Sequence, residues 1–71
     1  MLFLGYTAFH DITLYIYVQE NGLYQVEEYV LEDLAHTQQD LTKDRLSSLY
    51  RAFDLETLDW DRAEMAPRMA S

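Results

Sequence analysis

The stretch ITLYIYVQENGLYQVEEY, Ile12 to Tyr29, decides the fold of this chain. Two runs of alternating apolar and polar residues flank Glu20-Asn21-Gly22. Asn-Gly between such runs is the strongest short-range signal for a β-hairpin, because both residues tolerate the positive φ that tight hairpin turns need. The stretch therefore predicts two antiparallel strands joined by a short loop.

The register of this hairpin follows from which side chains it would bring face to face. A two-residue loop would set Ile16 opposite Glu27, a polar group against a core residue. A three-residue loop at 20–22, with its glycine left-handed, sets Ile16 opposite Val26 instead. It also sets Tyr15 opposite Glu27 on the other side of the sheet, where tyrosines then alternate with acids. The remaining expected pairs are Val18 with Tyr24 and Tyr17 with Gln25.

A further strand and a turn precede the hairpin. Leu2 to Phe9 has the composition of a strand, in which Gly5 marks a bulge or the close approach of another backbone. His10-Asp11 then turns the chain, so we expect a three-stranded antiparallel β-meander. A sheet of this size needs a helical cover to be stable.

The residues after the hairpin change period. In VLEDLAHTQQ, residues 30–39, apolar side chains recur at helical spacing and two acids fall in the first turn, where the helix dipole favours them. We expect a short helix from about Leu31 to Gln38, followed by a linker. A longer helix beginning near Gln25 is the alternative, but the Asn-Gly turn favours a strand for residues 23–29.

The next helix has the clearest pattern in the chain. Thr42 is a good N-cap, and Leu41 before it can pack on Leu46 as a hydrophobic staple. Apolar residues then recur at i, i+3, i+4 and i+7 and form one face. The members of that face are Leu46, Leu49, Tyr50 and Phe53.

Asp54 can cap a further short helix that runs toward Met65 and ends before Pro67. Residues 66–71 are expected to form a flexible C-terminal tail. Residues 1–65 then make a single α+β domain: a three-stranded antiparallel β-meander followed by two or three short helices packed on one sheet face.

The charge is distributed unevenly along the 71 residues, whose formal net charge is −8. Residues 1–42 hold seven acids and no lysine or arginine, whereas residues 43–71 hold six acids and five basic residues. Such a surface repels nucleic acid, so we expect no direct DNA or RNA binding, and it attracts basic partners. Acidity serves solubility in many small proteins, but 42 positions without a basic residue favour a functional role.

The chain contains no cysteine, which removes disulfides and thiolate chemistry and suits a reducing cytoplasm. The apolar start, residues 1–4, has no basic residue before it, and Asp11 interrupts the sequence well short of a membrane span. We therefore expect a cytoplasmic protein with no membrane segment.

No arrangement of residues indicates catalysis, a cofactor or a metal. His10 and Asp11, with Ser47 or Ser48, supply the residue types of a hydrolytic triad, but no strained elbow or enclosed pocket is indicated. Glu32 and His36 share one face of the expected first helix, as in half of a metal site whose partner half is missing. We expect a non-catalytic protein without cofactor or metal.

Tyrosine is enriched, at six of 71 residues. Packing in strands alone can favour tyrosine, but Tyr15 and Tyr17 fall on the sheet face opposite the aliphatic residues. Aromatic anchors with an acidic rim fit a protein interface. The expected partner-binding residues are Tyr15, Tyr17, Glu20, Tyr24, Glu27, Glu28, Glu32 and Asp33.

Small size, strong acidity, surface aromatics and the lack of an enzyme motif resemble phage-encoded inhibitors of host DNA-acting enzymes, including uracil-DNA glycosylase inhibitors and anti-CRISPR proteins. The resemblance is one of type and carries over no family residue. It implies a DNA-mimic-like inhibitor that binds a basic, nucleic-acid-binding partner in the host cytoplasm. Acids at i and i+2 of a strand lie roughly 6.6 Å apart, a spacing that can imitate a row of phosphates.

The alternative is a non-catalytic structural or regulatory subunit, such as an antitoxin or an assembly factor. Such a subunit would oligomerise through the tyrosine-rich sheet face, as a homodimer or with another protein. Salt separates the two hypotheses, because an electrostatic mimic loses affinity as ionic strength rises and an apolar interface loses little.

Overall fold

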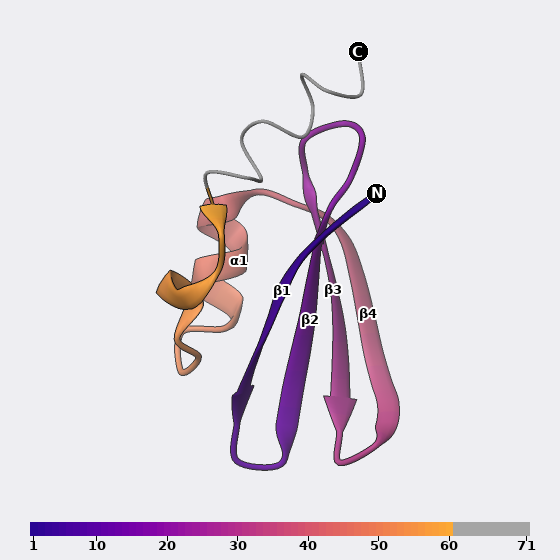
Figure 1. Cartoon of the computed structure of the whole chain (residues 1–71), viewed down its shortest axis with the longest axis vertical. Helices are drawn as coiled ribbons and strands as arrows, with labels where there is room; N and C mark the ends of the chain where they lie inside the picture. Colours follow the sequence, from indigo (N-terminus) through magenta and orange to yellow (C-terminus); the bar gives the residue numbers. More distant parts are fainter. Residues whose placement is uncertain (61–71) are drawn as a thin grey trace.

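The computed structural model describes residues 1–60, which form a four-stranded antiparallel sheet followed by one α-helix and a 3-10 helix (Figure 1). The strands lie in sequence order, so the sheet is a meander. The elements are β1 (Leu2–Phe9), β2 (Ile12–Val18), β3 (Tyr24–Val30), β4 (Asp33–Leu41), α1 (Lys43–Leu49) and η1 (Leu55–Thr57). The α+β class is as predicted, with one strand more than expected. The expected tail at 66–71 and the end of the expected last helix, 61–65, lie outside the described residues.

The central hairpin has the predicted register. Ile16 pairs with Val26 and Tyr15 with Glu27. The loop spans residues 20–22, closed by a hydrogen bond of 2.8 Å from the Gln19 amide to the Leu23 carbonyl, and Gly22 is left-handed with φ 83°. The three-residue loop is therefore confirmed, and it fixes which side chains face the core.

The helix predicted from Leu31 to Gln38 is wrong, because this segment is the edge strand β4. A two-residue turn, Leu31-Glu32, joins β3 to β4, with Leu31 at φ 57°. Pairing with β3 satisfies backbone groups that an isolated short helix would leave to water. The linker expected after that helix, residues 38–40, is strand as well, and so is Leu41.

The bulge predicted at Gly5 is present, since the β1–β2 register shifts between Phe3 and Gly5. The close approach there comes from a side chain rather than from a backbone: a Cβ on Gly5 would lie 2.9 Å from Leu58 Cδ2. On the N-terminal side of the bulge, Phe3 pairs with Tyr17, on the face away from the core. The bulge therefore decides which residues of β1 each face receives.

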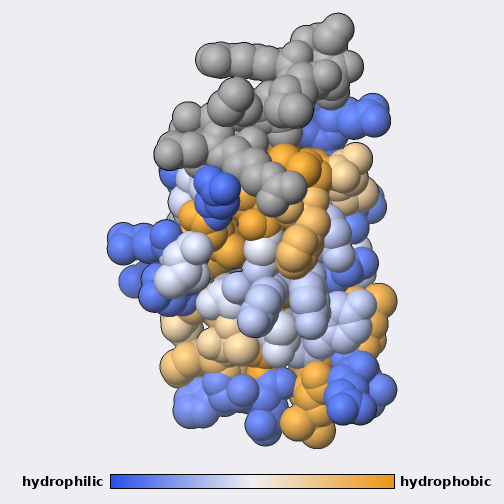
Figure 2. Space-filling view, viewed as in Figure 1, coloured by the Kyte–Doolittle hydropathy of each residue, from blue (hydrophilic) through white to orange (hydrophobic). Residues whose placement is uncertain are grey.

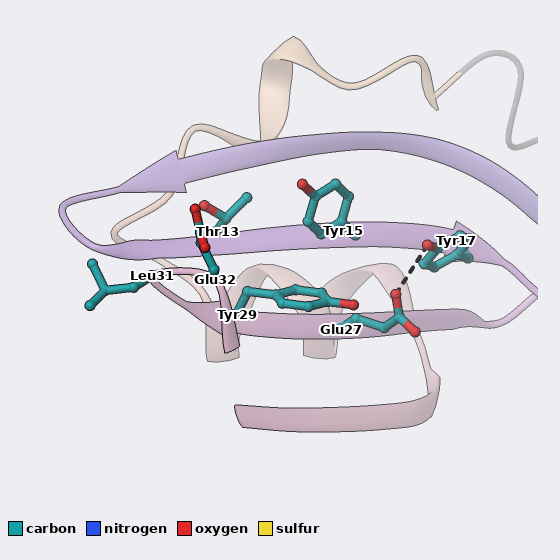
Figure 3. Close-up of a pocket in the computed structure, with 7 residues that line it drawn as sticks. All are labelled: Thr13, Tyr15, Tyr17, Glu27, Tyr29, Leu31 and Glu32. Atoms are coloured by element: carbon teal, nitrogen blue, oxygen red, sulfur yellow. Dashed lines mark hydrogen bonds between the residues drawn. The ribbon is translucent and has the colours of Figure 1, made fainter. Parts of the chain in front are cut away.

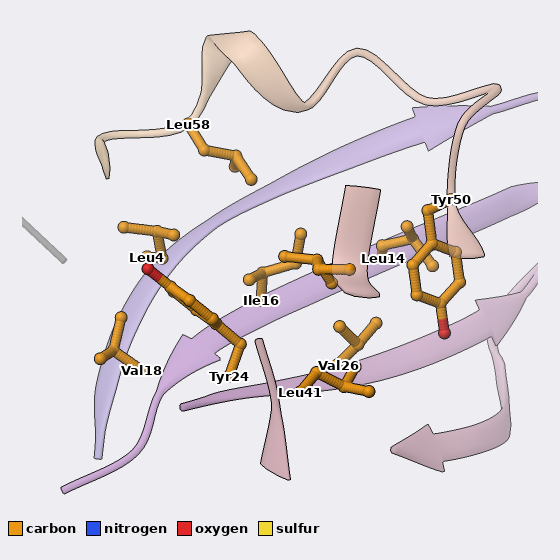
Figure 4. Close-up of a cluster of buried hydrophobic side chains, with 10 residues drawn as sticks. Leu4, Leu14, Ile16, Val18, Tyr24, Val26, Leu41, Tyr50 and Leu58 are labelled. Atoms are coloured by element: carbon orange, nitrogen blue, oxygen red, sulfur yellow. The ribbon is translucent and has the colours of Figure 1, made fainter. Parts of the chain in front are cut away.

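The core lies between the sheet and the segment that carries α1 and η1 (Figure 4). Thr42 caps α1 as predicted, its Oγ1 accepting from the Arg45 amide at 3.1 Å. Of the expected helix face, Leu46 and Tyr50 are buried, whereas Leu49 is exposed. Each fully buried aliphatic side chain stabilises the fold by about 1.5–3 kcal/mol. The buried hydrophobic residues are Leu4, Leu14, Ile16, Val18, Tyr24, Val26, Leu41, Leu46, Tyr50 and Leu58.

Candidate functional site

The sheet face opposite α1, here called the open face, carries a row of aromatic rings. Tyr15 on β2 lies at its centre, with ring centroids 5.2 Å from Tyr29 on β3 and 6.0 Å from Tyr6 on β1. Phe3 lies 5.3 Å from Tyr17 and 6.2 Å from Tyr15. Tilted and edge-to-face pairs at these separations each contribute about 0.5–1.5 kcal/mol beyond their burial. The row is therefore a fixed surface built from three adjacent strands.

A hollow of about 380 Å³ opens on this face. Figure 3 shows Tyr15 and Tyr29 projecting side by side over the strands, with Leu31 and Glu32 near one end and Tyr17 and Glu27 near the other. The planes of the Tyr15 and Tyr29 rings meet at 82°, so they form a corner. The full lining is Thr13, Tyr15, Tyr17, Glu27, Tyr29, Leu31 and Glu32. The hollow thus combines aromatic walls with a carboxylate toward each end.

The hydroxyl of Tyr17 donates to Oε1 of Glu27 at 3.0 Å (Figure 3). Burial raises the pKa of the Tyr17 phenol, and the hydrogen bond and the charge of Glu27 raise it further. The phenol therefore stays protonated and keeps donating at neutral pH. This bond holds the Glu27 carboxylate at the edge of the rings.

A polar cluster lies at the loop end of the hairpin. Asp40, left-handed at φ 59°, accepts from Nε2 of Gln19 at 2.9 Å and from Nδ2 of Asn21 at 3.2 Å. Its backbone amide donates to Oε1 of Gln19 at 2.8 Å. These hydrogen bonds lower the pKa of the Asp40 carboxyl. With Glu20, Asp40 lines a second shallow hollow, so carboxylates flank the loop end as well.

The structure brings together four of the eight expected contact residues. Tyr15, Tyr17, Glu27 and Glu32 line the aromatic hollow. Glu20 is exposed at the loop end, in the second hollow.

The other three expected contact residues lie elsewhere. Tyr24 is a core residue, 9% exposed, with its ring 5.5 Å from that of Trp60, as its pairing with Val18 requires. Glu28 pairs with Leu14 and acts electrostatically on Tyr50, which places it on the helix side. Asp33 pairs with Val30, two residues along β3 from Glu28 and therefore on that same side. Neighbours in a strand point to opposite faces, so Glu27 and Glu28 cannot serve one surface.

Three aromatic residues of the open face were not among the expected contact residues: Phe3, Tyr6 and Tyr29. Tyr29 could have been found, because it lies two residues from Glu27 and shares its face. Phe3 could not, since the bulge at Gly5 sets its side.

Apolar side chains are also exposed at the end of the sheet that carries the β1–β2 and β3–β4 turns. Figure 2 shows strongly hydrophilic and strongly hydrophobic surface side by side at this lower end of the molecule. The exposed large apolar residues there are Phe9, Val30, Leu31 and Leu34. Of the described helices, none is long and apolar enough to cross a membrane.

No protein-family model matches this chain, and neither the curated proteins nor the solved structures contain a match to it.

Proposed function

We propose that this protein is a small acidic interaction module, an inhibitor of the DNA-mimic type, that binds a basic nucleic-acid-binding protein through its open face. The observation that carries the proposal is the aromatic hollow with Glu27 and Glu32 toward its ends. Aromatic anchors supply contact area, and carboxylates at their rim select a positively charged partner.

The position of the basic residues supports this orientation. Among the described residues Lys43, Arg45 and Arg51 carry the positive side chains, all of them in or just after α1. Nζ of Lys43 lies 4.7 Å from the centre of the Trp60 ring, on the side of the molecule that carries the helices. The strands and their turns hold no lysine or arginine, so every charged side chain that they carry at neutral pH, histidine aside, is negative.

A capture experiment tests the proposal. The tagged chain is incubated with cell lysate and washed at low and then at high salt, and the eluates are identified by mass spectrometry. We expect a basic nucleic-acid-binding protein that salt releases, and we expect competing duplex DNA to displace it. Capture that neither salt nor DNA affects would contradict the proposal.

A second candidate is a subunit that self-associates through the same face. It is favoured by β1, an edge strand with no charged side chain, on which Phe3 and Tyr6 are 41% and 64% exposed. Uncharged edge strands offer unpaired backbone groups to another chain. Sedimentation of the pure protein distinguishes the two, because a dimer of this kind persists at high salt.

A further inference from the structure

We propose that the hollow lined by Tyr15, Tyr29 and Glu27 binds one arginine side chain of the partner, with the guanidinium against the rings and its N–H groups directed to the Glu27 carboxylate. This inference rests on the proposed function and names the group that its binding face recognises. It assigns a binding role to a hollow of about 380 Å³, a size suited to a side chain rather than to a folded element.

The aromatic rings of the hollow suit a cation. The face of a phenol ring carries negative electrostatic potential, so a cation placed over it is attracted. Tyr15 and Tyr29 are in edge-to-face contact at 82° and 5.2 Å, so a ligand in the hollow lies beside this pair, against the ring surfaces that line the hollow. Tyr17 adds a third ring to the lining. An apolar ligand would gain from the rings alone, but a cation also gains from the quadrupole.

The carboxylates of the hollow complement the charge of a cation. Glu27 is half-buried beside the rings, and one of its two oxygens accepts from Tyr17 at 3.0 Å. A carboxylate oxygen accepts more than one hydrogen bond, so Glu27 can still receive a donor while Tyr17 holds it in place. Glu32 lies toward the opposite end of the hollow. A cation seated between them meets charge of opposite sign at both ends.

The shape of the ligand decides between arginine and lysine. A guanidinium is planar, stacks on aromatic faces and is more weakly hydrated than an ammonium, so it loses less on entering a half-open aromatic hollow. It also presents several N–H donors in a fixed fork that matches a carboxylate. Thr13 and Leu31 complete the lining with a hydroxyl and an apolar side chain, which suit the donors and the methylene stem respectively.

The test is a titration of the 15N-labelled full chain with three small probes: N-acetyl-arginine methyl ester, the lysine ester, and the citrulline ester, a neutral isostere of arginine. We expect the arginine probe to shift the amides of Thr13, Tyr15 and Tyr29 and to bind several-fold more tightly than the lysine probe. The citrulline probe should leave these signals unmoved. Equal binding of citrulline, or lysine binding as tightly as arginine, would overturn the inference.

Matched variants locate the effect. Glu27→Gln should remove most of the arginine response, whereas Glu28→Gln, one residue along and on the opposite face, should leave it unchanged. Tyr29→Leu should weaken binding by about two- to fivefold, the range of a cation–π contact at an exposed site, and Tyr29→Phe should retain it. If Glu28→Gln reduces binding as much as Glu27→Gln, the cation responds to net charge and no arginine site exists.

The two proposals fail separately. Capture of a basic partner that depends on Glu27, combined with no preference for the arginine probe, overturns the arginine site and leaves the proposed function standing. Arginine binding in the hollow without any salt-sensitive partner supports the site and removes the proposed function.

Discussion

Tyr17 and Glu27 are joined diagonally across two strands, by a hydrogen bond of 3.0 Å from the phenol to the carboxylate, although Glu27 pairs directly with Tyr15. The diagonal bond places a negative charge among the aromatic rings of the open face. Glu28, the next residue, acts instead on Tyr50, the C-cap of α1. Two adjacent glutamates thus belong to two different surfaces.

This separation predicts opposite outcomes for two charge reversals. Glu27→Lys should abolish capture of a basic partner, because it puts a cation where the partner's cation would lie. Glu28→Lys, with the same change in net charge, should keep most of the binding. The measurement is capture at low salt by each variant, after circular dichroism has verified that both are folded. Equal loss in both variants would mean that net charge alone governs binding.

The raised pKa values of Tyr17 and Tyr50 predict a loss of stability at alkaline pH. The Tyr50 pKa is raised by burial and by Glu28, opposed by the hydrogen bond from Gln38, and the Tyr17 pKa is raised too. In the unfolded chain these phenols ionise near 10.0, so above that pH the folded chain binds more protons than the unfolded one. Stability should then fall as the pH rises from about 10 through the folded pKa values.

Urea unfolding at pH 8 and at successive steps above pH 10 measures this slope. Tyr50→Phe should be somewhat less stable at pH 8, because Gln38 loses its partner, but should show a shallower decline in alkali. A decline as steep as that of the unmodified chain would show that Tyr50 is not its source.

Leu31 predicts a stabilising substitution. It sits in the turn between β3 and β4 at φ 57° and is 69% exposed, so it bears left-handed strain and buries little. Asparagine tolerates this conformation, so Leu31→Asn should stabilise the fold by about 0.5–1 kcal/mol. Thermal unfolding should show a rise of a few degrees, and Leu31→Ala, whose side chain cannot hydrogen-bond to the local backbone, should show none. A lower Tm for Leu31→Asn would mean that the leucine side chain itself stabilises the turn.

Gly5 is a position where a substitution should destabilise the fold. A Cβ there would lie 2.9 Å from Leu58 Cδ2, and the backbone has φ 155°, a region L residues rarely adopt. Gly5→Ala should cost about 1–3 kcal/mol, the range for overpacking a core. Leu58→Ala alone should also destabilise, but the double variant should lose less than the two losses combined. Fully additive losses in urea unfolding would place the strain in the backbone alone.

The sequence predicted the central hairpin well because its signals are local. Asn21-Gly22 indicates the turn, and the alternation of Leu14, Ile16 and Val18 indicates the buried face. These cues agree with each other, and the structure has the same register.

The edge strand β4 escaped prediction because its sequence carries neither cue. Most of its residues are exposed on both faces, so no alternation of apolar and polar side chains marks it. The turn before it contains no glycine, asparagine or proline, and a leucine takes the left-handed position. Without those signals, the chance spacing of Val30, Leu31 and Leu34 resembles a helix.

Only the part of the candidate site that depends on the hairpin register was predicted from the sequence. Tyr15, Tyr17 and Glu27 follow from the hairpin register, whereas Glu28 and Asp33 were assigned by charge without regard to face. Phe3 depends on a bulge whose effect on register appears only once β1 and β2 are paired.

Every strand of the meander pairs with its immediate neighbour in the sequence, through turns at His10-Asp11, at residues 20–22 and at Leu31-Glu32. Closing such short loops costs little chain entropy, and no strand has to wait for a partner from a distant part of the chain. The chain has no cysteine whose oxidation would have to be completed first. Refolding after dilution from denaturant should therefore take a single fast phase, and the open face becomes available as soon as the three hairpins have closed.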